Sequence, residues 1–264
     1  MKALAFIFIL LPLFSLAQIN QADANGYRQG NWKKFFENGK IRYEGSFKDN
    51  KPVGEWKRYH DNGNLQAKIY YSETSDSAVS EIYNLKGKLI ASGNFVSEKK
   101  EGLWKFFSGT RLVSESNFLQ GIKHGLEKMY YESGEILEEI EWINNLKHGK
   151  YKAFFKNGQP YMECMFKEGN RDGYCVGYFE NGKMEMDAFY AGNKRDGDWK
   201  HFDQNGELLY TLKYYFGELL NPHVLDSIQG QAFDKLERNR SGIVDPEKFM
   251  QNPEEYMMNI KIQK

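Results

Sequence analysis

Short runs that alternate apolar and polar residues fill most of this chain, and many of them flank a small polar turn. Residues 30–47 read GNWKKFFENGKIRYEGSF, in which two such runs are separated by Asn38 and Gly39. Alternation is typical of half-buried strands, and Asn-Gly between two runs is the strongest short signal for a β-hairpin. Glycine suits the turn because it adopts a positive φ without a side-chain clash. The segment therefore predicts a β-hairpin.

The same pattern recurs about every 24 residues. A glycine opens most repeats, at positions 30, 54, 102, 125, 149, 173 and 197, and a degenerate repeat opens at Ala78. With the opening residue numbered zero, and one shorter turn allowed for, positions 5 and 17 are aromatic in all eight repeats. Position 9 is the turn glycine in seven of them: Gly39, Gly63, Gly87, Gly134, Gly158, Gly182 and Gly206.

One hairpin is marginally stable in water, so hairpin repeats must stack to bury their apolar faces. The sequence therefore predicts a mainly β fold, an elongated open antiparallel sheet of about eight stacked hairpins over residues 30–220. The polar segments between repeats, such as INNLKHG and AGNKRDG, supply the return turns.

The turn type decides which side chains share a face of the sheet. A two-residue loop would place position 3 opposite position 14, for example Lys33 opposite Glu44. A type I turn with a glycine bulge would instead group position 5 with positions 11, 13, 15 and 17. We favour the bulge, because segregating large aromatic side chains is worth more than surface ion pairs.

With the bulge, the tryptophans at position 2 share the other face with the aromatic residues at position 6. A second, partly aromatic face is a candidate surface for a partner or ligand. The candidate binding residues are Trp32, Phe36, Trp56, Trp104, Tyr131, Phe155, Phe179 and Trp199.

The repeat, written G-x-W-x-x-Y-Y-x-N-G, resembles the MORN repeat in its variant form of about 24 residues. The resemblance covers residues 30 to about 220. Such chains are similar to a bacterial MORN-variant family that is often labelled as an antitoxin component of toxin–antitoxin systems. MORN repeats in general are associated with scaffolding, protein–protein contact and contact with membrane lipids. The resemblance therefore implies an interaction module, and it supplies no catalytic residues.

The first 17 residues have the features of a secretory signal peptide. One lysine precedes an apolar run from Ala3 to Leu16, and Ser15 and Ala17 are the small residues expected before a cleavage site. The alternative, a membrane anchor, is disfavoured because this run would span only about 21 Å as a helix. We expect cleavage after Ala17, export to the periplasm, envelope or cell exterior, and no later transmembrane segment. Residues 18–29 then form an N-terminal lead-in.

Residues 221–264 break the repeat pattern and predict short helices. Leu225, Ile228, Ala232 and Leu236 have helical spacing, and two later segments start with Asp-Pro-Glu and Asn-Pro-Glu, which favour helix starts. We interpret this region as a helical C-terminal cap over the last strand. The alternative is a docking element for a partner.

The remaining residues give no sign of catalysis. Lysine plus arginine equals aspartate plus glutamate, 36 each, so the chain lacks the positive charge of a nucleic-acid binder. No nucleophile motif occurs, and His124 and His148, at the same place in adjacent return turns, are too few for a metal site. We expect no catalytic residue, metal or cofactor. Cys164 and Cys175 can form a disulfide or act as two small buried apolar residues.

These features together predict a non-enzymatic exported scaffold or protein–protein interaction module of the bacterial cell envelope, whose partner is an unknown envelope protein. One alternative is a repeat protein that binds glycans or lipid headgroups along the tryptophans. Another is an antitoxin-like protein.

Overall fold

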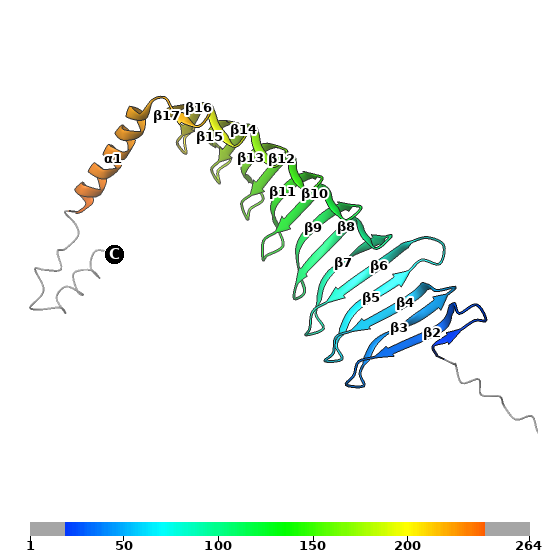
Figure 1. Cartoon of the computed structure of the whole chain (residues 1–264). Coiled ribbons are helices and arrows are strands. Elements are labelled where there is room, and N and C mark those ends of the chain that lie inside the picture. Colours follow the sequence, from blue (N-terminus) through cyan, green and yellow to red (C-terminus); the bar gives the residue numbers. More distant parts are fainter. Residues whose placement is uncertain (1–18, 241–264) are drawn as a thin grey trace, which may run out of the picture. The chain divides into compact units, whose positions relative to one another are not determined.

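The computed structural model describes residues 19–240, which form two segments, residues 19–160 and residues 161–240. Within this range the chain has eighteen strands and one helix, and the strands of each segment follow one another as antiparallel hairpins (Figure 1). The predicted open antiparallel sheet of stacked β-hairpins is therefore confirmed. The predicted signal peptide, residues 1–17, and the helices expected after residue 240 lie outside the described residues.

The N-terminal segment, residues 19–160, holds the first twelve strands, and each strand from β2 to β11 pairs antiparallel with the next one. The strands are β1 (Gln21–Ala22), β2 (Arg28–Phe35), β3 (Ile41–Lys48), β4 (Lys51–Tyr59), β5 (Leu65–Tyr71), β6 (Ser77–Tyr83), β7 (Leu89–Val96), β8 (Lys99–Ser108), β9 (Arg111–Leu119), β10 (Ile122–Tyr130), β11 (Ile136–Ile143) and β12 (Leu146–Phe154).

The C-terminal segment, residues 161–240, continues the same hairpin pattern and ends in a helix. Its elements are β13 (Pro160–Lys167), β14 (Asn170–Tyr178), β15 (Met184–Ala191), β16 (Lys194–Phe202), β17 (Leu208–Tyr215), β18 (Glu218–Leu219) and α1 (Pro222–Arg240).

Most of the repeat hairpins contain two irregularities, a glycine turn and a register shift. In the first repeat, the Gly39 N–H donates to the Phe36 carbonyl at 3.0 Å, the Phe36 N–H donates to the Lys40 carbonyl at 2.8 Å, and Gly39 has a φ of 78°. This is the glycine turn expected from the sequence. A second register shift follows, because Lys34 lies opposite Tyr43 whereas Phe35 lies opposite Ile41.

The glycine turn alone would move the side chains of the second strand to the other face of the sheet. The second register shift moves them back. Trp32 consequently lies opposite Gly45, and Phe47, at position 17, lies opposite Gly30 on the same face as Trp32. Our prediction that tryptophan and the position 17 aromatic lie on opposite faces was therefore wrong. Lys33 lies opposite Glu44, so the pairing expected for a two-residue loop coexists with the bulge.

Asparagine side chains protect the first and last long strands of the described chain. Beyond the two-residue strand β1, the Asn20 carboxamide oxygen accepts the Lys33 N–H at 2.8 Å. Beyond β18, the Asn221 side chain accepts the Lys213 N–H at 2.8 Å and donates to the Thr211 carbonyl at 2.9 Å. Part of each edge thus has its backbone groups satisfied, which discourages pairing with another chain there.

Helix α1 covers little of the last strand. Val224, Leu225 and Ile228 are half-buried, but Phe233 and Leu236 are 62% and 68% exposed. Edge protection therefore comes mainly from residues 218–221 rather than from the body of the helix. No helix within residues 19–240 is long and apolar enough to cross a membrane.

Candidate functional site

The tryptophans of the predicted binding stripe are packed inside the sheet face. Trp104 has no exposed surface, and Trp56 and Trp199 are each 5% exposed, whereas Trp32, in the first repeat, is half-buried. Aromatic residues at position 17 surround them edge-on. The Trp56 ring lies 4.7 Å from the Phe47 ring and 6.1 Å from the Tyr71 ring, measured between centroids.

Each buried tryptophan lies on a small residue of the preceding repeat. A Cβ atom added to Gly45 would lie 2.2 Å from the Trp56 ring, and one added to Gly93 would lie 2.4 Å from the Trp104 ring. Both glycines are at position 15, and neither has a positive φ. Glycine is therefore required here by close packing rather than by backbone conformation.

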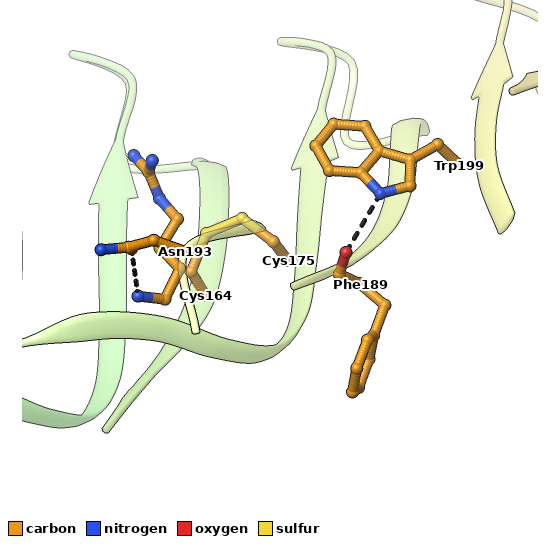
Figure 2. The surroundings of a disulfide bond; sticks show 6 residues. Cys164, Cys175, Phe189, Asn193 and Trp199 are labelled. Atoms are coloured by element: carbon orange, nitrogen blue, oxygen red, sulfur yellow. Dashed lines mark hydrogen bonds between the residues drawn. A yellow bond between two sulfur atoms is a disulfide. The ribbon is translucent and has the colours of Figure 1, made fainter. Parts of the chain in front are cut away.

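A hydrogen bond fixes each of these indole rings. The Nε1–H groups of Trp56, Trp104 and Trp199 donate at 2.9–3.0 Å to the carbonyl at position 16 of the preceding repeat. Figure 2 shows this bond between Trp199 and Phe189. The tryptophan at position 2 thus joins one repeat to the previous one by both packing and a hydrogen bond, and a buried indole needs such a partner.

Repeats without this tryptophan use other pairs at positions 15 and 2. Ile69 at position 15 is followed by Ser80 at position 2 of the next repeat, and Ser116 is followed in the same way by Glu127. The Glu127 carboxylate accepts a hydrogen bond from the Ser116 hydroxyl at 2.7 Å. The Glu127 carboxylate also pairs with Lys123 at 2.6 Å, which compensates for its burial.

The two cysteines form such a pair. Cys164 at position 15 and Cys175 at position 2 lie directly opposite on β13 and β14, and a disulfide joins them (Figure 2). They are 3% and 2% exposed. The alternative of two free thiols is therefore excluded in this structure, and a covalent bond occupies the place of the tryptophan contact.

The predicted residues at position 6 are less buried than the tryptophans. Phe36, Tyr131, Phe155 and Phe179 are each half-buried. The Tyr131 hydroxyl donates to the Phe154 carbonyl at 2.7 Å, so this side chain contributes to the contact between repeats. The structure therefore places Trp56, Trp104, Trp199 and Tyr131 at contacts between repeats. The binding role of all eight residues stays a prediction.

Cations two residues before the opening glycine lie over the aromatic rings. Lys100 Nζ lies 4.6, 5.0 and 4.9 Å from the ring centroids of Trp104, Phe106 and Phe118. Burial lowers the pKa of Lys100, and the nearby Lys123 adds to this effect. Equivalent cations lie over the rings of other repeats: Arg28, Lys123, Lys147, Arg171 and Arg195. Cation–π contacts of this kind stabilise the packed face.

The opposite face carries charged residues at positions 3 and 14. Lys33 pairs with Glu44 at 2.9 Å, and Lys128 pairs with Glu139 at 2.9 Å. The Tyr59 hydroxyl also donates to Glu44, at 2.8 Å. Burial, together with this hydrogen bond, raises the pKa of Tyr59 to about 12.

Among residues 19–240, no group of three or more His, Cys, Asp or Glu residues could hold a metal ion. His124 and His148 are both half-buried, and His124 Nδ1 has no hydrogen-bond partner.

Sequence reasoning missed two sets of residues that build this face. The small residues at position 15 and the cations two residues before the opening glycine both recur with the repeat period, so the period could have identified them. Their role depends on the face they occupy, which we had assigned incorrectly.

A family model for the MORN repeat variant matches residues 28–49, 52–73, 123–144, 147–168 and 195–215. These five segments are MORN repeat variants. Four of the five matched MORN segments begin at the cation that covers the aromatic rings, at Arg28, Lys123, Lys147 and Arg195. The intervening repeats, which open at Ala78, Gly102 and Gly173, also form antiparallel hairpins, and the turn of the Gly102 repeat is shorter.

No curated protein matches the MORN-repeat chain. Among solved structures, it is similar to part of a GtfA/B complex, with 10% identity and a TM-score of 0.26 over 33% of this chain and 18% of that chain. It is also similar to a variant of S. aureus TarM, with 15% identity and a TM-score of 0.18 over 41% and 19% of the two chains. A further TarM structure gives 16% identity and a TM-score of 0.18 over 47% and 20%. This chain spans about a fifth of the length of these proteins.

Proposed function

We propose that this MORN-repeat chain is a non-enzymatic interaction module that works outside the cytoplasm, in the cell envelope. The sheet face opposite the tryptophans is the proposed contact surface. We choose this face because Trp56, Trp104 and Trp199 on the other face are buried and have little surface left for a partner.

The proposed contact surface contains an exposed row of apolar residues beside the paired charges. Tyr70 and Val79 lie directly opposite each other on β5 and β6 and are 60% and 58% exposed. Leu103 and Leu126, both at position 1, are 44% and 37% exposed. Apolar and aromatic residues bordered by charges are the usual composition of a protein interface.

Two features support work outside the cytoplasm. Residues 1–17 have the composition of a signal peptide. The Cys164–Cys175 disulfide is of the kind that persists in oxidising compartments and is rare in the cytosol.

Site-specific photocrosslinking in the native host tests the proposal. A photoreactive amino acid placed at Tyr70 or Leu103 should give one discrete protein adduct in the envelope fraction. The same residue at Asn205, in a hairpin turn of the C-terminal segment, should give none. Uncleaved protein found only in the cytosol, or the absence of an adduct at both Tyr70 and Leu103, would contradict the proposal.

A further inference from the structure

A hollow of about 490 Å³ opens on the tryptophan face of the N-terminal segment, near the hairpin turns of the first two repeats. Its volume falls within the range of about 300–1,000 Å³ typical of small-molecule sites. The wall residues relevant here are Phe36, Arg42, Tyr43, Arg58, Asp61 and Gln66. The hollow lies on the face opposite the proposed protein contact surface, so the two can be tested separately.

The two arginines lack carboxylate partners. Within the described chain, neither Arg42 nor Arg58 forms an ion pair, and both are exposed. Lysines on the opposite face behave differently, since Lys33 pairs with Glu44 and Lys57 pairs with Glu55, each at 2.9 Å. The hollow therefore has unbalanced positive charge.

A cross-strand row places this charge beside an aromatic surface. Lys34, Tyr43 and Arg58 are successive register partners on β2, β3 and β4. The Arg42 guanidinium carbon lies 5.8 Å from the centroid of the Phe36 ring. The guanidinium groups therefore lie next to apolar ring surface while they stay accessible to a ligand. Arginine also binds a carboxylate through two parallel N–H bonds.

The rest of the wall limits which anion can bind. Asp61 adds a negative charge, which disfavours a compact ligand of high negative charge such as phosphate. Its carboxylate and the Gln66 carboxamide can instead hydrogen-bond ligand hydroxyl groups. The wall therefore suits a ligand that has one acidic group and several hydroxyls.

We propose that this hollow binds an acidic saccharide through a single sugar carboxylate. Arg42 and Arg58 hold the carboxylate, and Asp61 and Gln66 accept or donate hydrogen bonds to the hydroxyls. Phe36 and Tyr43 supply the apolar surface against which the sugar ring lies. Phe36, one of the predicted binding residues, thus becomes part of a defined site.

Titration of the full chain with three small probes tests the proposal. D-glucuronate carries both the acid and the hydroxyls, acetate carries only the acid, and glucose carries only the hydroxyls. Calorimetry or NMR at low ionic strength should show saturable glucuronate binding at least tenfold tighter than binding of either other probe.

Three variants assign the binding to the hollow. Arg42→Ala and Arg58→Ala should each weaken glucuronate binding about tenfold, the loss expected when one charged hydrogen-bonding group is removed. Arg238→Ala removes an exposed arginine of helix α1 and should leave binding unchanged. Near-UV circular dichroism checks that each variant is folded, because Tyr43 lies 5.7 Å from Trp56.

Two conservative variants can replace an alanine variant that misfolds. Arg58→Lys retains the charge but loses the two-pronged contact, and it should weaken glucuronate binding several-fold. Asp61→Asn should weaken glucuronate binding relative to acetate binding. The proposal is overturned if acetate or glucose binds as tightly as glucuronate, if glucuronate does not bind, or if Arg238→Ala has the same effect as Arg58→Ala.

Discussion

At the residue scale, the residue at position 15 packs against position 2 of the next repeat, and a glycine at position 15 accompanies a buried tryptophan. Gly45 and Gly93 leave room for Trp56 and Trp104, whereas the larger Ile69 precedes Ser80. Sequence reasoning identified the recurring tryptophans but not their partners, because the pairing crosses from one repeat to the next.

Gly45→Ala tests this packing rule. The added methyl group would overlap the Trp56 ring, so we expect a loss of about 1–3 kcal/mol in the free energy of unfolding, measured with urea. Gly177→Ala is the matched control, since its Cβ would lie 3.5 Å from Met186, an ordinary contact. This control should change stability by less than about 1 kcal/mol. Equal losses in the two variants would contradict the packing rule.

The Tyr59–Glu44 hydrogen bond predicts a change at high pH. The pKa of Tyr59 is raised from 10.0 to about 12 by burial and by Glu44, so the folded chain retains the phenol proton that the unfolded chain loses above pH 10.0. This contribution to stability is complete below pH 10.0 and is lost as the pH rises through about 12. Subtracting the ultraviolet titration of Tyr59→Phe from that of the wild type isolates the transition. A Tyr59 pKa near 10.0 would contradict this result.

At the scale of the strand and hairpin, two irregularities act together. The glycine turn could be predicted, because Asn-Gly and its period are visible in the sequence. The second register shift could not, because its position holds residues as different as Arg42, Gln66 and Ile90. One undetected residue of shift exchanges the faces of a strand, which is why the number of hairpins was predicted correctly and their faces were not.

Removing the Asn221 side chain should loosen the edge of the sheet locally, at the end of the C-terminal segment. Asn221→Ala removes both of its bonds to β17, so hydrogen exchange of the Lys213 amide should become faster and stability should fall by about 1 kcal/mol. Asn205→Ala is the control, since its side chain bonds only to Asp203 within the same turn. Unchanged Lys213 exchange in Asn221→Ala would show that the edge does not depend on this side chain.

Removing the disulfide should lower the stability of the same segment by a larger amount. Replacing Cys164 and Cys175 together by alanine should cost about 2–4 kcal/mol, measured by urea unfolding. Thiol counting by mass spectrometry should find no free thiol in the exported wild-type protein. Detection of two free thiols there would contradict the disulfide and remove one support for export.

At the scale of the whole molecule, the repeats give the sheet two faces with different roles. Tryptophans, position 17 aromatics and their covering cations hold neighbouring repeats together on one face. Paired charges and exposed apolar residues occupy the other. The repeat period was enough to predict the fold, because each repeat must bury its face against its neighbours. Assigning a role to each face required the register.

Adjacent residues of β8 provide the most direct test of this division. Trp104 is completely buried and Leu103 is 44% exposed on the opposite face. Urea unfolding should show a loss of about 3–5 kcal/mol for Trp104→Ala and a change within about 0.5 kcal/mol for Leu103→Ala. Losses of equal size in the two variants, or a Trp104→Ala protein as stable as the wild type, would contradict the division.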